Sequence, residues 1–262
     1  MKTNLRSSLF ILALAAGLAS CNKEKPYTIH GTLDLPDQVP YGDTIIDVPS
    51  FEGTWVYLID FDSTPVDSAE IQDNNFLFEG SVKGDETYYL QFVSQIGNSL
   101  VAIEPGNIDI NVTLNGILIS GTSSNDAMSD ADAVMENLNA DTYARYSALV
   151  DSLQQLGQEL SEEQHLRLAQ EFQNAMAYQL DSIYQANQSN LGGPYALLLR
   201  HMDSESSAEF EEAISAYPEA IRNNQLLQYN LRMLRQYEAM YDTAADSDSL
   251  TLEPAEIETL TK

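Results

Sequence analysis

The stretch Ile108-Asp-Ile-Asn-Val-Thr-Leu-Asn-Gly116 decides the fold of the first half of this chain of 262 residues. Apolar residues at positions 108, 110, 112 and 114 alternate with Asp, Asn and Thr, which is the pattern of a strand with one buried and one solvated face. Asn115-Gly116 then lies between two apolar runs, and this dipeptide is a strong signal for a β-hairpin. Residues 108–114 are therefore predicted to pair with the run that follows Gly116.

Further strands are indicated upstream of this hairpin. Phe76 and Phe78 occupy alternate positions of one run, and Trp55-Val-Tyr-Leu-Ile59 is apolar on both faces, as in a central strand. Turn residues separate the runs at 73–75, 83–85 and 104–107. Several short strands at this spacing predict an antiparallel β-sandwich or barrel over residues 27–122.

The period becomes helical near Asn125. Two apolar stripes at helical spacing follow, one from Tyr143 to Leu160 and one from Leu168 to Ile183. Ser161 with Gln164, and Ser206 with Glu209, have the spacing of capping boxes that begin helices. The fold class is therefore predicted as α+β, with an α-helical module over 123–243 that packs partly against the sheet. We expect a flexible acidic tail over 244–262.

The first 21 residues have the order of a bacterial secretory signal. Lys2 and Arg6 precede a short apolar run, and Cys21, the only cysteine, follows Leu18-Ala-Ser20. This end resembles the lipobox of bacterial lipoproteins, in which the cysteine becomes the lipidated N-terminus. We expect a signal peptide over 1–20 and a lipidated tether over 21–26. An ordinary cleaved signal with an incidental cysteine is the alternative.

The charge of the chain is strongly negative. The formal net charge is −28, and Lys83 is the only lysine or arginine between Tyr27 and Thr122. Such a surface repels phosphate backbones, so nucleic acid is excluded as a partner. Solubility on a crowded membrane surface is the favoured explanation of the acidity.

Several fragments match one family pattern in order. They are residues 27–31 (YTIHG), 56–58 (VYL), 66–69 (VDSA), 76–80 (FLFEG), 103–108 (IEPGNI) and 120–125 (SGTSSN). Residues 27–125 resemble the domain-of-unknown-function family 4369, which occurs in envelope lipoproteins of Gram-negative bacteria. The resemblance implies a β-rich domain and assigns no catalytic residue to it.

Longer members of that family continue into a thioredoxin-like domain with a Trp-Cys-x-x-Cys site. The present sequence ends at Lys262 and contains no cysteine besides Cys21. A dithiol redox cycle needs an attacking and a resolving thiol. The thiol–disulfide activity of the longer family members is therefore not expected for this sequence. No cofactor is expected.

Other candidate chemistry is weak. The histidines, His30, His165 and His201, belong to no metal-spaced cluster, and no nucleophile elbow supports a hydrolase, which is kept as the weakest alternative. Asp60-Phe-Asp62 and Asp246-Ser-Asp248 lack the glycine and glutamate of a calcium loop. We interpret both as solvated acidic turns, with weak calcium binding as the minor alternative, and predict no metal site.

One triplet, Asp followed by Ser or Thr and then a small aliphatic residue or Thr, is over-represented. It resembles the O-glycosylation acceptor of the same group of bacteria, and exposed sites would be favoured. The alternative is that Asp-Ser pairs simply suit turns. The candidate acceptors are Thr44, Ser63, Ser68, Ser152, Ser182, Thr243 and Ser249.

The leading hypothesis is a lipid-anchored envelope protein, not an enzyme, that binds or scaffolds a protein or glycan partner. The rival is an accessory factor that docks separate thioredoxin-like proteins. Membrane contact is expected through the lipid on Cys21. The expected location is the outer membrane, facing the periplasm, and display on the cell surface is the alternative.

Overall fold

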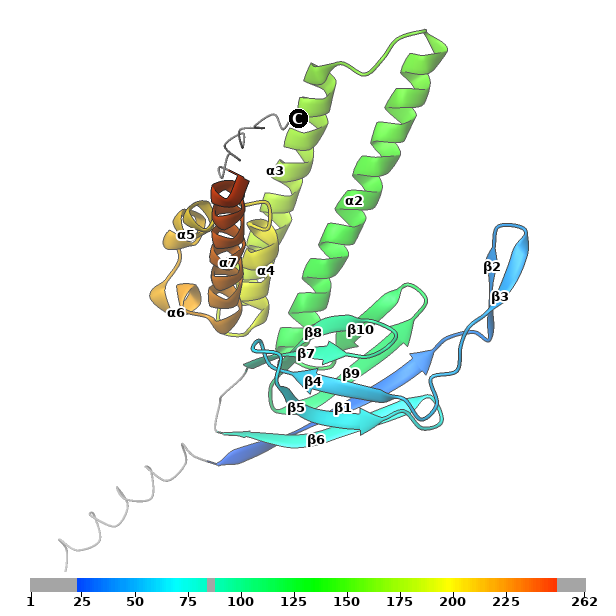
Figure 1. Ribbon diagram of the computed structural model, residues 1–262, viewed down its shortest axis with the longest axis vertical. Coiled ribbons are helices and arrows are strands. Elements are labelled where there is room, and N and C mark those ends of the chain that lie inside the picture. The colour runs from blue at the N-terminus through cyan, green and yellow to red at the C-terminus, as the bar shows by residue number, and fades with distance from the viewer. Residues whose placement is uncertain (1–22, 84–87, 249–262) are drawn as a thin grey trace, which may run out of the picture.

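The computed structural model describes residues 23–83 and 88–248, and it has a strand-rich first half followed by helices (Figure 1). The predicted α+β class is confirmed. Two four-stranded sheets form most of the first half, in the orders β10-β9-β1-β6 and β5-β4-β7-β8, and β2 and β3 form a separate two-stranded sheet. The strands are β1 Glu24–Asp34, β2 Gln38–Tyr41, β3 Thr44–Asp47, β4 Trp55–Ile59, β5 Pro65–Glu70, β6 Asn75–Lys83, β7 Tyr88–Val93, β8 Asn98–Ile103, β9 Gly106–Thr113 and β10 Gly116–Ser120.

The pairing of β1 with β9 is parallel, whereas the sequence analysis predicted antiparallel sheets. Parallel neighbours cannot be joined by a tight hairpin, because the chain must first return to the same end of the sheet. Here the strands of the second sheet lie in the sequence between β1 and β9. Through them the chain returns to the end of the first sheet at which β9 begins. The described strands form two open four-stranded sheets and the separate β2–β3 pair, so the alternative of a closed barrel does not apply.

One apolar core lies between the two sheets. The alternating residues Ile108, Ile110 and Val112 are buried in it, as the sequence predicts. Leu114 is exposed, because it belongs to the turn between β9 and β10, whose register pairs Thr113 with Gly116. The hairpin prediction is confirmed, with its turn centred one residue earlier than Asn115-Gly116. The other core residues include Ile29, Val56, Leu58, Ile71, Phe78, Val101 and Ile103.

Two aromatic rings cover glycines across the pair β1–β6. In this register Tyr27 lies opposite Gly80, and Gly31 lies opposite Phe76. A Cβ on Gly31 would lie 1.9 Å from the Phe76 ring, and one on Gly80 would lie 2.4 Å from the Tyr27 ring. Each ring therefore occupies the space of a missing side chain on the neighbouring strand.

Strand β4 is central in its sheet, as predicted, but only one of its faces is buried. Val56 and Leu58 are fully buried, whereas Trp55 and Tyr57 are exposed by 47% and 39%. The strand is therefore apolar on both faces, as the sequence shows, but the second face is exposed at this end of the sheet.

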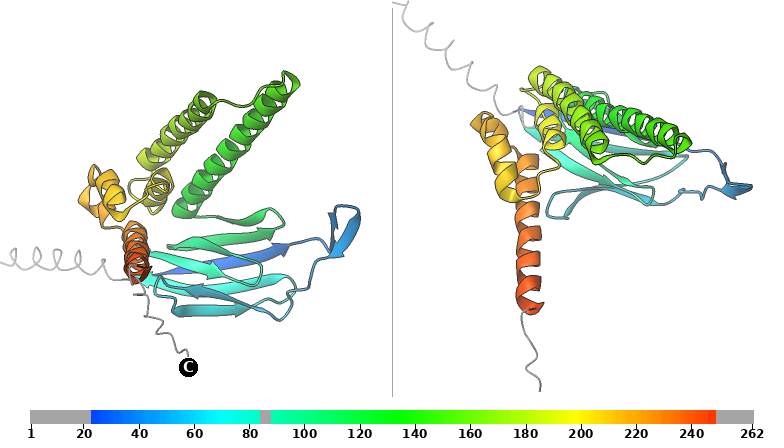
Figure 2. Two further views of the ribbon diagram at one scale, coloured as in Figure 1. Left: turned by 45° about the horizontal axis from the view of Figure 1, so that its top comes forward. Right: turned by 90° about the horizontal axis from the view of Figure 1, so that it is seen from above.

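The helices are α2 Ser123–Gln155, α3 Glu162–Ala186, α4 Gly192–Arg200, α5 Ser207–Ser215, α6 Glu219–Arg222 and α7 Gln225–Asp248. Helices α2 and α3 form a long hairpin whose far end projects from the sandwich (Figure 1). Figure 2 shows α7 running in a different direction from this hairpin. Ser161 and Gln164 form the predicted reciprocal capping box, and Ser206 caps α5. Helix α7 continues beyond residue 243, where the tail was predicted to begin.

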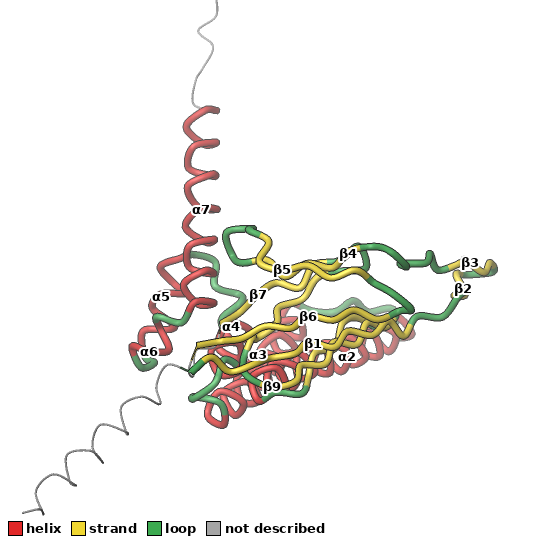
Figure 3. The backbone as a smooth tube through the Cα atoms, turned by 90° about the horizontal axis from the view of Figure 1, so that it is seen from below, coloured by secondary structure: helices red, strands yellow, loops and turns green. Residues whose placement is uncertain are grey.

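The described helices pack against the strands, as predicted: α2 contacts β10 of the first sheet and β8 of the second, and α7 contacts β7. Tyr89 and Ala102 from the strands share a buried cluster with Met128, Leu191 and Leu226 from the helices. The two-stranded arm β2–β3 projects from the sandwich in a different direction (Figure 3). The sandwich therefore carries both projecting hairpins.

Replacing Gly31 by alanine should destabilise the sandwich, because the new methyl group would overlap the buried Phe76 ring. We expect the free energy of unfolding in urea to fall by about 1–3 kcal/mol, the usual cost of overpacking a core. His30→Ala is the matched control, since His30 is exposed on the same strand. Equal stability of the two variants would contradict the role given to the Phe76–Gly31 pair.

Candidate functional site at the joint between sheet and helices

A buried carboxylate ties the end of β8 to the start of α2. Glu104 follows directly after β8 and is only 7% exposed. Its Oε1 accepts a hydrogen bond from the backbone N–H of Ser124 at 2.8 Å, and its Oε2 accepts one from the Ser124 hydroxyl at 2.8 Å. Ser124 lies in the first turn of α2, where backbone N–H groups have no partner within the helix. Glu104 thus caps α2 from the sheet, and its negative charge lies at the positive end of the helix dipole.

Asn125 makes a second connection between α2 and β8, through side-chain hydrogen bonds. Its Oδ1 accepts from the backbone N–H of Ala102 at 2.9 Å, and its Nδ2 donates to the carbonyl of Ala102 at 2.8 Å. The same Nδ2 also donates to the Thr122 hydroxyl oxygen at 2.8 Å. The side chain therefore pairs with β8 in the way a neighbouring strand would, and it leaves no polar group of Ala102 unsatisfied.

The start of α4 is held at the same place. The Ser124 hydroxyl oxygen accepts from the backbone N–H of Leu191 at 3.1 Å, and the Tyr89 hydroxyl donates to the Leu191 carbonyl. Burial raises the pKa of Tyr89 well above its ordinary value, so the phenol stays a neutral donor. We call this set the joint, and its members are Tyr89, Ala102, Glu104, Thr122, Ser124, Asn125 and Leu191.

A second contact links the turn after β4 to α7. The Phe61 ring stacks on Tyr229 with ring centres 4.3 Å apart. The Arg232 guanidinium lies over Tyr229 and 3.6 Å from a carboxylate oxygen of Asp62. The Asp60-Phe-Asp62 segment is therefore a turn that docks a helix. The Asp60 carboxylate accepts from the backbone N–H groups of Asp62 and Thr64, which stabilises the turn itself.

The polar groups of the joint bond to one another, and this arrangement holds elements together. The histidines lie apart, His30 on β1, His165 in α3 and His201 at the end of α4, and no described histidine side chain hydrogen-bonds a serine or a carboxylate. Burial lowers the pKa of His201, with the Arg200 charge adding to this effect. In the described residues, no group of three or more His, Cys, Asp or Glu side chains could hold a metal ion.

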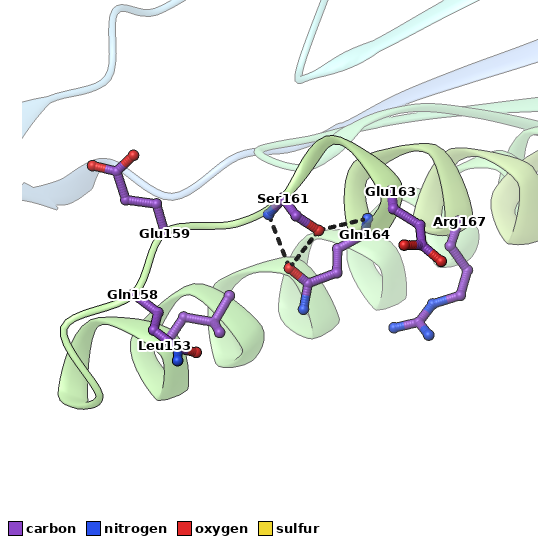
Figure 4. A pocket seen from close by; sticks show the side chains of 7 residues that line it. All are labelled: Leu153, Gln158, Glu159, Ser161, Glu163, Gln164 and Arg167. Atoms are coloured by element: carbon purple, nitrogen blue, oxygen red, sulfur yellow. Dashed lines mark hydrogen bonds between the residues drawn. The ribbon is translucent and has the colours of Figure 1, made fainter.

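The pocket at the turn between α2 and α3 has a volume of about 590 Å³. Figure 4 shows the Ser161 and Gln164 side chains bonded to each other at its edge, with Glu159, Glu163 and Arg167 around them. Ser161 Oγ accepts from the Gln164 backbone at 3.3 Å, and Gln164 Oε1 accepts from the Ser161 backbone at 2.9 Å. Both polar side chains are thus engaged in capping α3.

The other predicted site residues are scattered. Cys21 and Ser249 lie outside the described residues, and Thr243 lies in α7 where side chains are not described. The other candidate glycosylation acceptors are exposed on four separate elements and one turn, and the fold does not bring them together. They are Thr44 on β3, Ser63 in the turn after β4, Ser68 on β5, Ser152 in α2 and Ser182 in α3.

From the sequence, Glu104 belongs to a predicted turn and Asn125 to the start of the helical region, and neither side chain is predicted to join the sheet to the helices. A signal was present in both cases. Glu104 ends an apolar run, and Asn125 stands where a polar helix begins. The two fragments 103–108 and 120–125 meet at the joint, which gives a physical reason for their occurrence together.

Residues 27–128 match the model of a family described as a domain of unknown function (DUF4369). The resemblance stated from the sequence fragments is therefore confirmed. No curated protein and no solved structure matches the chain. Among the described residues, no helix has the length and apolar character needed to cross a membrane.

Glu104→Ala should destabilise the protein, because it leaves the backbone N–H and hydroxyl of Ser124 without their buried acceptor. The expected loss is about 1–3 kcal/mol for each unsatisfied group, measured by urea unfolding. Glu104→Gln should lose less, since its amide oxygen still accepts. Glu136→Ala, on the exposed face of α2, is the control. Equal losses for Glu104→Ala and Glu136→Ala would disprove the capping role.

Proposed function

We propose that this protein is a non-catalytic binding and scaffolding lipoprotein of a Gram-negative cell envelope, anchored through lipid on Cys21. In this proposal the sandwich is the base, and the joint holds the α2–α3 hairpin as a rigid arm that presents a surface to a protein partner. The anchor is inferred from the sequence signal, and residue 21 precedes β1 by only a few residues. The base would therefore lie close to the membrane and the hairpin would reach away from the joint.

The observation that carries the proposal is how the polar groups at the joint are used. A buried carboxylate, a buried amide and three hydroxyl groups bond there to backbone groups and to one another. Buried polar groups of this kind are found either in catalytic sites or in structural networks. Because each partner at the joint belongs to a sheet end or a helix start, these groups support a scaffold.

Exposed side chains along the α2–α3 hairpin support a binding role. Tyr143 on α2 and Tyr178 on α3 are 73% and 79% exposed, and Leu156 and Leu166 are exposed as well. Exposed aromatic and leucine side chains on one projecting element are typical of a surface that a partner covers. The net charge of −28 favours a partner with a basic surface.

The anchoring part of the proposal predicts a change of cell fraction. Cys21→Ala should move the protein from the membrane fraction to the soluble fraction, or leave an uncleaved precursor, because no thiol remains to accept lipid. The intact mass of the wild-type protein should exceed that of the unmodified mature chain by the mass of the acyl groups. An unmodified Cys21 at the mature N-terminus would refute the anchor.

The scaffold part predicts a fixed distance between base and arm. Cys21→Ser gives a cysteine-free chain, so spin labels can be placed at new cysteines in β6 and α2, with Glu79→Cys and Gln154→Cys. Electron spin resonance should give one narrow distance distribution. Adding Glu104→Ala should broaden it, and adding the control Glu136→Ala should not. A distribution that is equally broad without Glu104→Ala would refute a rigid arm.

A further inference from the structure

The outer face of the sheet β5-β4-β7-β8 is covered at one end and bare at the other. Tyr89 and Ala102 lie opposite each other on this face and are fully buried beneath the helices. Farther along the same face, Trp55 and Tyr57 are 47% and 39% exposed. In Figure 3, β4 and β5 lie on the side of the sandwich away from α2 and α3. This end of the face therefore has no cover from the long hairpin.

The two exposed rings stand on a rigid platform. Trp55 and Tyr57 are two residues apart on β4, so both side chains leave the same face about 7 Å apart. Tyr57 lies opposite Ser68 on β5 and opposite Val93 on β7, and Trp55 lies opposite Glu70. Tyr57 is paired with both neighbouring strands and Trp55 with β5, so the sheet holds the backbone from which both rings project.

A groove of about 450 Å³ runs beside the rings. Its lining consists of Gly53, Thr54, Trp55, Tyr57, Val93, Ser94 and Gln95. A Cβ on Gly53 would lie 3.8 Å from Glu70 Oε1, so the Glu70 carboxylate borders the same space. The Thr54 and Ser94 hydroxyls donate to the backbone carbonyls of Phe51 and Gly97. The Gln95 side chain is exposed at the rim. The Glu70 carboxylate beside it is exposed as well, with Oε2 accepting a hydrogen bond from Gln72 Nε2 at 3.2 Å and Oε1 lying near Gly53.

The chemistry of this groove selects a class of ligand. No lining residue is a lysine or arginine, and Glu70 adds a negative charge, so an anionic ligand would meet repulsion. A purely apolar ligand would displace water from the Gln95 amide and the Glu70 carboxylate and could not replace the hydrogen bonds that this water makes. A pyranose sugar satisfies both conditions, because it has apolar C–H faces for the rings and uncharged hydroxyls for the rim.

We propose that the Trp55–Tyr57 groove binds a neutral oligosaccharide. Its sugar rings stack on Trp55 and Tyr57, and its hydroxyl groups donate hydrogen bonds to the side-chain oxygens of Glu70 and Gln95. This inference adds a glycan ligand to the binding role proposed above. It rests on the proposed function, in which the protein binds its partners without catalysing a reaction. The site lies on a different surface from the α2–α3 hairpin. Its test is therefore separate from the tests of the anchor and of the rigid arm.

The chain provides its own probe, because Trp55 is its only tryptophan. The mature full-length protein is titrated with maltohexaose, cellohexaose and chitohexaose, in a detergent that has no sugar headgroup. At least one of the three should produce a saturable change in tryptophan emission and should protect Trp55 from quenching by acrylamide. A trigalacturonate, which is anionic, should produce neither effect.

Calorimetry then assigns binding to the groove. Trp55→Ala and Tyr57→Ala should each weaken binding at least about 10-fold, whereas Trp55→Phe, which keeps a ring, should weaken it less. Tyr143→Ala, an exposed aromatic on α2, is the matched control and should bind like the wild type. The proposal is overturned if none of the three oligosaccharides binds at millimolar concentration, or if binding survives the double change Trp55→Ala and Tyr57→Ala.

Discussion

The contact between Glu104 and the first turn of α2 is the constraint on which the arrangement of the molecule depends. A helix that begins against a sheet has backbone N–H groups that water cannot reach, and these groups need an acceptor. Thr122 is the N-cap residue of α2, but its side chain makes no capping hydrogen bond. Glu104 supplies the acceptor from the end of β8 instead. The direction of α2 is thereby linked to the sheet, and α3 and α4 follow because they pack on α2.

The buried polar groups of the joint also explain why the sandwich and the helices form one structure. Asn125 satisfies both backbone groups of Ala102, and Ser124 bonds both Glu104 and Leu191. Removing one member leaves its partners buried without hydrogen bonds, which costs more than the net gain from forming the bond. The network therefore favours one relative placement of β8, α2 and α4 over neighbouring placements. Apolar contacts alone would discriminate less between such placements.

Aromatic rings fill the core of the sandwich, and other aromatic rings are exposed on its outer surface. Inside, the Tyr27–Gly80 and Gly31–Phe76 pairs let large rings fill space that a second side chain would otherwise occupy. Outside, the helices cover Tyr89 and Ala102 but leave Trp55 and Tyr57 exposed on the same face. A sheet face covered at only one end combines a rigid base with an accessible aromatic surface. This combination supports the oligosaccharide binding proposed above, since the backbone of β4 is already ordered before a ligand arrives.

The sequence by itself determined the features that depend on near neighbours. The alternation at Ile108, Ile110 and Val112 predicted a strand, and the Ser161 cap predicted the start of α3, because both patterns repeat within a few residues. Only the tertiary structure decided the parallel pairing of β1 with β9, the partner of Glu104 and the exposure of Trp55. These features depend on which distant segments meet, and local periodicity carries no information about such contacts. The fragments 103–108 and 120–125 predicted membership of a family, but only the fold shows that they meet and hydrogen-bond to each other.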